Sequence, residues 1–292
     1  MQPMVQRLVT NHSYSSIVSM KKIMRNGHSF RVNADGYERF WDRFENQSWE
    51  PDTTDIFDTY IDKNTTYIDI GAWIGPTLFY AAQMAGKCFA IEADPIAFRR
   101  LDENHKLNSD AKWFSNIELI NKAISDQVGQ ISFGSQAAGG DSMSSVLWGD
   151  LDTSWQVDTI NVHQLIDKIQ DDSTRLFVKI DIEGGEFTML ESLKHLFALE
   201  DATIHLSLHN IFLKRSLVLK YKHLNFIKRF IKIRSEFVAT YRQLFNCLPN
   251  DKDCSINGRP LAHSPWVFLS IWLFCKPPKE KKYRDILITP KL

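Results

Sequence analysis

The stretch at residues 66–82 constrains the fold more than any other part of this 292-residue chain. Tyr67, Ile68 and Ile70 form a short run of aromatic and β-branched residues, which predicts a buried strand. Two glycines follow at a predicted turn, and Pro76 stands where the first position of a helix tolerates a missing N–H. A strand, a glycine turn and a helix start direct backbone N–H groups toward a ligand, so the stretch predicts a nucleotide-type binding loop.

Predicted strands and helices alternate along most of the chain, as expected for parallel βαβ units. The run at 176–182 is apolar apart from Lys179 and Asp181, which is typical of a central parallel strand covered on both faces. The pattern therefore predicts an α/β fold with a doubly wound, mostly parallel sheet of seven strands. Strands are predicted at residues 67–70, 88–91, 117–120, 131–133, 157–160, 176–182, 203–208, 237–241 and 267–274, and the last two of these are expected to be the last two of the sheet.

The chain is predicted to contain one Rossmann-like domain, at residues 61–276, with additions at both ends. Residues 1–60 are expected to form an N-terminal helical extension that packs on the core, and 277–292, rich in proline and lysine, a flexible tail. A helical insertion is predicted at 212–234, where eight residues are Lys or Arg and none is acidic. Recognition of an anionic acceptor, contact with a membrane surface and a solvated helix face are the three uses considered for it.

Composition and charge argue against several classes of function. The formal net charge is zero, so the overall charge gives no reason to expect nucleic acid as a partner. Residues 1–24 lack the continuous apolar core of a secretory signal, and the longest apolar run, 266–275, is too short to span a bilayer. The four cysteines show no metal-binding spacing. Cys247 and Cys254 could pair, but a reduced, cytoplasmic protein is expected.

The loops that follow the predicted strands carry most of the chemistry, because ligands of open α/β sheets bind beyond the carboxyl ends of the strands. The loop at 69–75 lacks the GKS or GKT of a P-loop, which argues against a simple NTPase. It also lacks GxGxxG, so a dinucleotide-binding fold is less well supported. Glu92, about twenty residues after the glycine turn, is placed to accept hydrogen bonds from a ribose diol.

A second acidic loop, at 181–186, follows the predicted central strand. One of its carboxylates could hold a ligand ammonium group, and another could take a proton from a substrate hydroxyl or contribute to a metal site. Glu186 could instead cap the next helix. His209 ends the neighbouring strand on the same sheet edge and could act as a base or a ligand.

Two segments carry a resemblance to a known family. Residues 67–75, Tyr-Ile-Asp-Ile-Gly-Ala-Trp-Ile-Gly, and residues 179–186, Lys-Ile-Asp-Ile-Glu-Gly-Gly-Glu, resemble the FkbM family of S-adenosylmethionine-dependent methyltransferases. The resemblance extends over roughly 49–210, with Glu92 between the two segments. It implies a class I methyltransferase fold and methyl transfer, commonly to a hydroxyl oxygen.

The resemblance also implies roles for individual residues. The first loop would line the methionine half of the cofactor, Glu92 would hold the ribose, and residues 121–124 would border the adenine. Trp73 stands where the wider family commonly has asparagine and is interpreted as a wall of the pocket. Gly185 replaces the usual alanine. The expected cofactor-binding residues are Asp69, Gly71, Ala72, Trp73, Gly75, Thr77, Glu92, Ala93, Asp94, Asn121, Ala123, Ile124 and Asp181.

We hypothesise that His209 or Glu183 accepts the hydroxyl proton beside Asp181, with Asp141 and Ser142 on a loop that closes over the substrate. A divalent metal bridging Asp181 and His209 is considered but not favoured. The expected acceptor is a hydroxyl of a sugar, a glycan or a small secondary metabolite, and a homodimer is a further expectation. The alternatives are an NAD(P)-dependent oxidoreductase and a noncatalytic cofactor-binding protein of the same fold.

Overall fold

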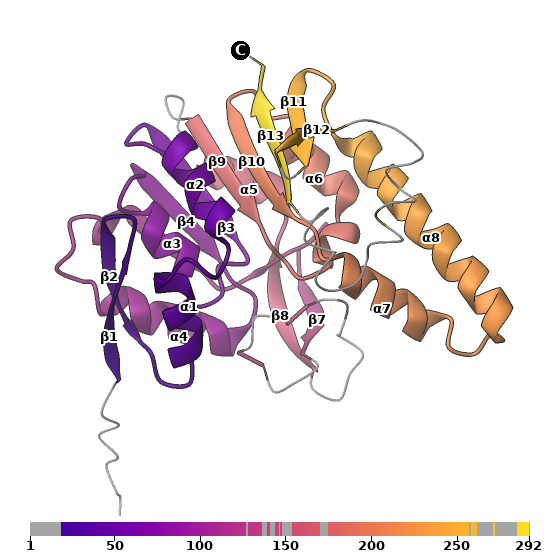
Figure 1. Cartoon of the computed structure of the whole chain (residues 1–292), viewed down its shortest axis with the longest axis horizontal. Helices are drawn as coiled ribbons and strands as arrows, with labels where there is room; N and C mark the ends of the chain where they lie inside the picture. The colour runs from indigo at the N-terminus through magenta and orange to yellow at the C-terminus, as the bar shows by residue number, and fades with distance from the viewer. Residues whose placement is uncertain are drawn as a thin grey trace, which may run out of the picture.

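A central mixed sheet organises the computed structural model, which describes residues 19–126, 128–135, 139–140, 144–145, 147, 154–169, 175–256, 258–261, 271 and 285–291. In chain order its strands are β3 (Thr65–Ile70), β4 (Lys87–Ile91), β5 (Ile117–Ile120), β9 (Arg175–Ile180), β10 (Ala202–Ser207), β11 (Lys252–Ile256), β12 (Arg259–Pro260) and β13 (Asp285–Pro290). In space the order is β12-β11-β13-β10-β9-β3-β4-β5 (Figure 1).

The five strands from β10 to β5 are parallel, and β13 runs antiparallel to β10. The prediction of a doubly wound, mostly parallel α/β fold is confirmed, although the described residues form eight strands in the sheet where seven were expected. The chain builds outward from β3 to β4 and β5 and then returns to place β9 on the other side of β3. This reversal is the topological switch point at which such sheets bind ligands.

Helices cover both faces of the sheet because successive side chains of each strand point to opposite faces. Tyr67 packs in one apolar cluster, together with residues of the N-terminal segment, while Ile68 and Ile70 pack in a second cluster on the other face. The first face carries α1 (Glu38–Glu45), α2 (Pro51–Tyr60), α3 (Pro76–Ala81) and α4 (Pro95–Lys106). The second carries α5 (Val162–Ile169), α6 (Leu190–Phe197), α7 (Asn210–Lys220) and α8 (Phe226–Cys247).

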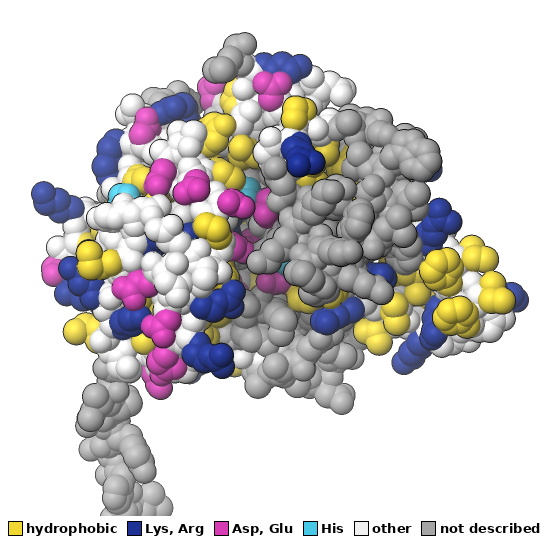
Figure 2. Space-filling model, viewed as in Figure 1, with side chains coloured by type: hydrophobic (Ala, Val, Ile, Leu, Met, Phe, Trp, Pro, Cys, Tyr) yellow, Lys and Arg dark blue, Asp and Glu magenta, His cyan; other side chains and the backbone are white. Residues whose placement is uncertain are grey.

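The helices α7 and α8 form an antiparallel pair that projects beyond the sheet (Figure 1). Hydrophobic and basic side chains gather at its far end, on the right of the space-filling view (Figure 2). A small separate sheet, in the order β6-β8-β7, contains Ala123–Ile124, Ser154–Ile160 and Gln130–Gly134. None of the described helices combines the length and the apolar character needed to cross a membrane. Cys247 and Cys254, which could have paired, are both free thiols.

Two predictions at the C-terminal end are wrong. Residues 237–241 lie in α8 and form no strand, because Phe237, Tyr241, Leu244 and Phe245 recur at helical spacing and bury one face of the helix. Residues 285–290, assigned to the flexible tail, form β13 between β10 and β11. Of the predicted strand at 267–274 the structure describes only Ile271, which is buried and helical, and the other positions lie outside the described residues.

The alternation in β13 explains its place in the sheet. Ile286 and Ile288 are fully buried, and Leu287 between them is partly exposed. This period of two is typical of a strand with one buried face. It is a stronger indicator of structure here than the nearby proline and lysine residues, from which a flexible tail was predicted.

The N-terminal segment contains a hairpin as well as helices, formed by β1 (Met20–Arg25) and β2 (His28–Asn33). Arg25 is 3% exposed and ties the hairpin to the helices that follow it. Its guanidinium donates to three backbone oxygens and one hydroxyl, at 2.8 to 3.2 Å. The acceptors are the backbone oxygens of Phe44, Trp49 and Glu50 and the hydroxyl of Thr54.

Replacing this guanidinium should unfold the extension from the core. We expect Arg25→Met to lower the free energy of unfolding by about 3 kcal/mol, because buried acceptors lose a charged donor. Urea unfolding followed by circular dichroism measures the loss. Lys22→Met, on the exposed side of the same strand, is the matched control. Equal losses in the two variants would contradict the assigned role of Arg25.

Candidate active site

A cavity of about 480 Å³ opens at the carboxyl ends of the central strands, within the size range of small-molecule sites. It lies at the switch point, between the loops that follow β3, β4, β9 and β10. Eleven of the residues predicted from sequence line it. They are Gly71, Ala72, Trp73, Thr77, Glu92, Ala93, Ala123, Ile124, Asp181, Glu183 and His209.

The first loop can form only with glycine at two positions. Gly71 has φ +87°, and a Cβ there would lie 1.9 Å from the backbone oxygen of Asp181. Gly75 has φ +93°, and its Cβ would lie 2.3 Å from the ring of Phe79. The two glycines therefore let β3 and β9 end against each other and let α3 start directly behind the loop.

Glu92 presents a nearly buried carboxylate to the cavity from the end of β4. Its two oxygens accept the backbone N–H groups of Trp73 and Asp94, each at 2.7 Å. Burial raises the pKa of Glu92 to about 7, although these two hydrogen bonds oppose the rise. A carboxyl group held in this way has one fixed orientation and can still accept hydrogen bonds from ligand hydroxyls.

Trp73 forms part of the cavity wall. Its backbone has φ +50°, a left-handed conformation that is uncommon outside glycine. The indole Nε1 donates to the backbone oxygen of Gly140 at 3.1 Å, and the ring packs edge-on against Phe40 and Tyr37. The hydroxyl of Tyr37 donates to the same backbone oxygen at 2.8 Å. The residue thus joins the N-terminal segment to the loop that contains Gly140.

A buried lysine links the ends of β3 and β9. The Nζ of Lys179 lies 3.0 Å from a carboxylate oxygen of Asp181 and 3.5 Å from one of Asp69. Burial alone would lower the pKa of Lys179, but the two carboxylates outweigh it and raise the pKa above its usual range. Asp69 also accepts the hydroxyl of Thr77 at 2.8 Å, so the start of α3 joins the same network.

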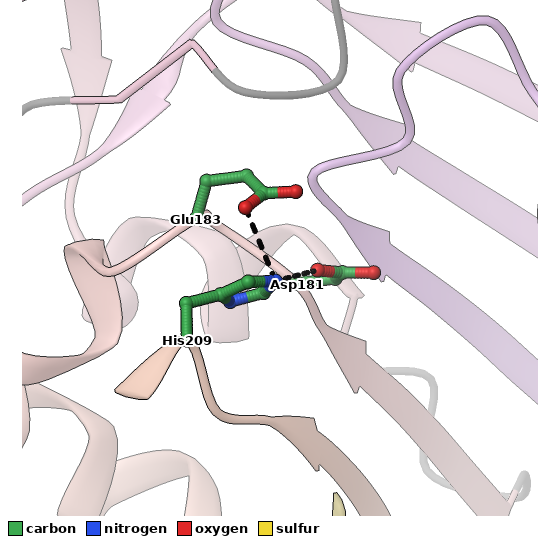
Figure 3. Close-up of side chains that lie close together, drawn as sticks. All are labelled: Asp181, Glu183 and His209. Atoms are coloured by element: carbon green, nitrogen blue, oxygen red, sulfur yellow. Dashed lines mark ion pairs between the residues drawn. The ribbon is translucent and has the colours of Figure 1, made fainter. Parts of the chain in front are cut away.

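His209 lies close to three carboxylates, and Figure 3 shows two of them, those of Asp181 and Glu183. Its Nε2 is 3.3 Å from Asp181 and 3.2 Å from Glu183, and its Nδ1 is 3.4 Å from Glu186. Burial would lower the pKa of His209, but Glu183, Glu186 and Asp181 together raise it to about 10. The imidazole is therefore held as a cation near neutral pH.

Glu186 supports this arrangement from a fully buried position. One oxygen accepts the backbone N–H of His209 at 2.7 Å, and the other accepts that of Gly184 at 2.8 Å. The sequence alone leaves two roles open for Glu186, a helix cap and a functional carboxylate. In the structure it joins the loop after β9 to the loop after β10.

The cluster formed by Asp181, Glu183 and His209 has two chemical uses. The carboxylates can receive a proton from a nearby hydroxyl while the imidazolium holds them in place. One ligand atom from each residue also lies within 4.8 Å of the other two, a spacing that could hold a divalent cation if His209 lost its proton.

Four residues predicted to bind the cofactor do not belong to the cavity lining and shape the loops around it. The Nδ2 of Asn121 donates to the backbone oxygen of Glu92 at 2.8 Å. Asp94 caps α4 and accepts the backbone N–H of Gly140 at 2.6 Å. The four are Asp69, Gly75, Asp94 and Asn121. The predicted substrate residues, Asp141 and Ser142, lie outside the described residues.

Several lining residues were not predicted from the sequence. Arg43 and Arg215 bring positive charge to the cavity, and Phe40 and Trp49 bring aromatic surface. Arg215 belongs to the basic segment that was singled out at 212–234. The others come from the N-terminal extension, which the sequence predicted only to pack on the core.

Comparison with known proteins identifies a family for this region. The model of the methyltransferase FkbM domain matches residues 69–234. No curated protein matches the chain.

Among solved structures, methyltransferase FkbM from Methylobacillus flagellatus KT has 15% identity, with 78% of this chain and 44% of that chain covered and a TM-score of 0.43. Trm5b from Pyrococcus abyssi has 14% identity and a TM-score of 0.37, with 93% of this chain and 55% of that chain covered. TYW2 from M. jannaschii, solved in complex with AdoMet, has 12% identity and a TM-score of 0.38, with 92% of this chain and 84% of that chain covered. The chain thus spans about half the length of the first two.

The imidazolium of His209 should make stability depend on pH. Its pKa is about 10 in the folded chain and 6.5 as a free side chain, so its contribution is complete below about pH 6.5 and is lost as pH rises toward 10. We expect the free energy of unfolding to fall over this range in the parent chain and to change less in His209→Gln. Urea unfolding at several pH values measures it. An imidazole NMR titration of His209 with a midpoint near 6.5 would contradict the assignment.

Proposed function

The chain belongs to the methyltransferase FkbM family, and we propose on that premise that it methylates a hydroxyl oxygen with S-adenosylmethionine as the methyl donor. The proposed acceptor class is a sugar, a glycan or a small secondary metabolite. One observation carries the proposal: within the family region, Glu92 and Asp181 face a single cavity from the ends of strands on either side of β3.

The residues around the cavity fit this donor. S-adenosylmethionine supplies an electrophilic methyl group on a positively charged sulfur, next to a ribose and an amino acid. Glu92 can accept hydrogen bonds from the two ribose hydroxyls, and Asp181 can receive the ammonium group. Ala123 and Ile124 offer apolar surface for the adenine. The acidic strand ends also favour a ligand that carries positive charge.

We assign Glu183 as the proton acceptor and His209 as a positioning residue. A histidine with a pKa of about 10 is already protonated near neutral pH and cannot accept a second proton. The Glu183 carboxylate is 19% exposed, so an acceptor hydroxyl can reach it. As the acceptor oxygen bonds to the methyl carbon and the carbon–sulfur bond breaks, the hydroxyl proton passes to Glu183.

Ligand binding distinguishes this proposal from its alternatives. We expect S-adenosylhomocysteine, the product of the donor, to raise the thermal unfolding temperature, and NAD and NADP to leave it unchanged. Glu92→Gln should weaken S-adenosylhomocysteine binding by about tenfold, because one charged hydrogen-bond acceptor is lost. Glu118→Gln, on the edge strand β5, is the matched control. Stabilisation by NAD or NADP alone would support an oxidoreductase, and no stabilisation by any of the three ligands would contradict the proposal.

Turnover tests the assigned proton acceptor. Transfer of labelled methyl groups into fractionated sugars, glycans and secondary metabolites identifies an acceptor for the assay. On that acceptor, Glu183→Gln should lower kcat by about 10²- to 10⁴-fold and leave the affinity for S-adenosylhomocysteine unchanged. His209→Gln should change both the rate and its pH profile.

Adding a chelator to the same assay distinguishes a mechanism that relies on proton transfer to Glu183 from one that requires a bound metal ion. The assignment of Glu183 predicts that turnover is unchanged after treatment with EDTA. Loss of turnover that Mg²⁺ restores would make Asp181, Glu183 and His209 a cation site and would overturn the assignment.

A further inference from the structure

The far end of the α7–α8 pair exposes large apolar side chains to water. We call residues 218–234, the end of α7, the turn and the first two turns of α8, the α7–α8 tip. Phe226 and Ile227 are 74% and 69% exposed, and four further apolar side chains of the tip are between 40% and 59% exposed. The exposed apolar residues of the tip are Val218, Leu219, Phe226, Ile227, Phe230 and Ile231.

Basic side chains surround this apolar surface. The tip contains six Lys or Arg residues and no Asp or Glu. In the space-filling view its hydrophobic and basic side chains lie side by side at one end of the molecule (Figure 2). The six basic residues are Lys220, Lys222, Lys228, Arg229, Lys232 and Arg234.

The first turns of α8 separate the two kinds of side chain. At 3.6 residues per turn, Phe226, Phe230, Ile227 and Ile231 fall within an arc of about 140°. Lys228, Lys232 and Arg229 fall on the opposite side. The remainder of α8 is held on the core by buried residues such as Phe237 and Tyr241, so the exposed face belongs to a fixed helix.

We propose that the α7–α8 tip docks on the surface of an anionic phospholipid bilayer. An amphipathic helix with large apolar residues on one face and lysines on the other inserts its apolar face at the boundary of head groups and acyl chains. Protein–protein interfaces are depleted in lysine, which argues against a protein partner. A nucleic acid would pair with the basic residues but would leave the isoleucines exposed.

Docking would bring the cavity close to the lipid surface. The helix α7 begins at Asn210, next to His209, and its first turns contribute Phe212 and Arg215 to the cavity lining. Its eleven residues span about 16 Å, so the cavity would lie roughly one short helix from the membrane. The inference concerns binding alone and does not rest on the proposed methyl transfer.

Flotation of the full chain with vesicles tests the proposal. We expect the protein to float with vesicles of phosphatidylcholine and phosphatidylserine, and to remain at the bottom with phosphatidylcholine alone. Added salt should weaken binding, because it screens the attraction between lysines and lipid head groups. Equal binding to the two kinds of vesicle, or to neither, would overturn the proposal.

Two sets of substitutions test the two faces of the tip. The triple variant Lys228→Glu, Arg229→Glu and Lys232→Glu should reduce partitioning by about 100-fold or more. The control triple variant is Lys63→Glu, Lys87→Glu and Arg99→Glu, at exposed positions remote from the tip, and should bind like the parent chain. Loss of binding in the control variant as well would mean that net charge alone is responsible and would overturn the proposal.

The apolar variant combines Phe226→Gln, Ile227→Gln, Phe230→Gln and Ile231→Gln, which preserve helix-forming residues. It should also lose vesicle binding while keeping the circular dichroism spectrum and the urea unfolding midpoint of the parent chain. Sedimentation velocity tests whether a second copy of this chain covers the tip instead of a membrane. A parent dimer that the apolar variant converts to a monomer, without any vesicle binding by the parent chain, would assign the tip to a second copy of this chain.

Discussion

The ammonium group of Lys179, buried between two carboxylates, is the interaction on which the site depends. Charges removed from water are tolerated only when they are paired, and Lys179 pairs with Asp69 from β3 and with Asp181 from β9. These strands flank the switch point, so one side chain fixes the relative position of the two loops that form the centre of the cavity. Removing it would take away the cation that pairs with the fully buried carboxylate of Asp69.

From this lysine, charge alternates across the ends of three neighbouring strands. Asp181 contacts Lys179 on one side and His209 on the other, and Glu186 then holds the backbone N–H of His209. Each ionised group stabilises the charged form of the next, which explains why the pKa of His209 is raised although the ring is buried. The result is a rigid acidic edge in which the partly exposed Glu183 is accessible to a substrate.

Local patterns in the sequence were sufficient to predict the strand ends and the acids that follow them. Gly71, Glu92 and Asp181 each follow a short apolar run, and the sheet brings such positions together at one edge. The pairing of Asp69 with Lys179 could not be predicted, because it depends on the register of β3 and β9, where the two residues lie opposite each other. Short aromatic and β-branched runs also gave a wrong prediction at 237–241, where a strand was expected and a helix is found, because a buried helix and a buried strand share that composition.

The hydrogen bonds of Arg25 connect the N-terminal segment to the cavity, since the segment that they anchor supplies Phe40, Arg43 and Trp49 to the cavity lining. The region that matches the family model, 69–234, is therefore smaller than the part of the chain that encloses the cavity. A recombinant fragment trimmed to that region would retain the acidic strand ends but would lack one side of the enclosure and the strand β13. Swapping the region between relatives would likewise transfer the acidic strand ends without the aromatic and basic side chains that line the other side of the cavity.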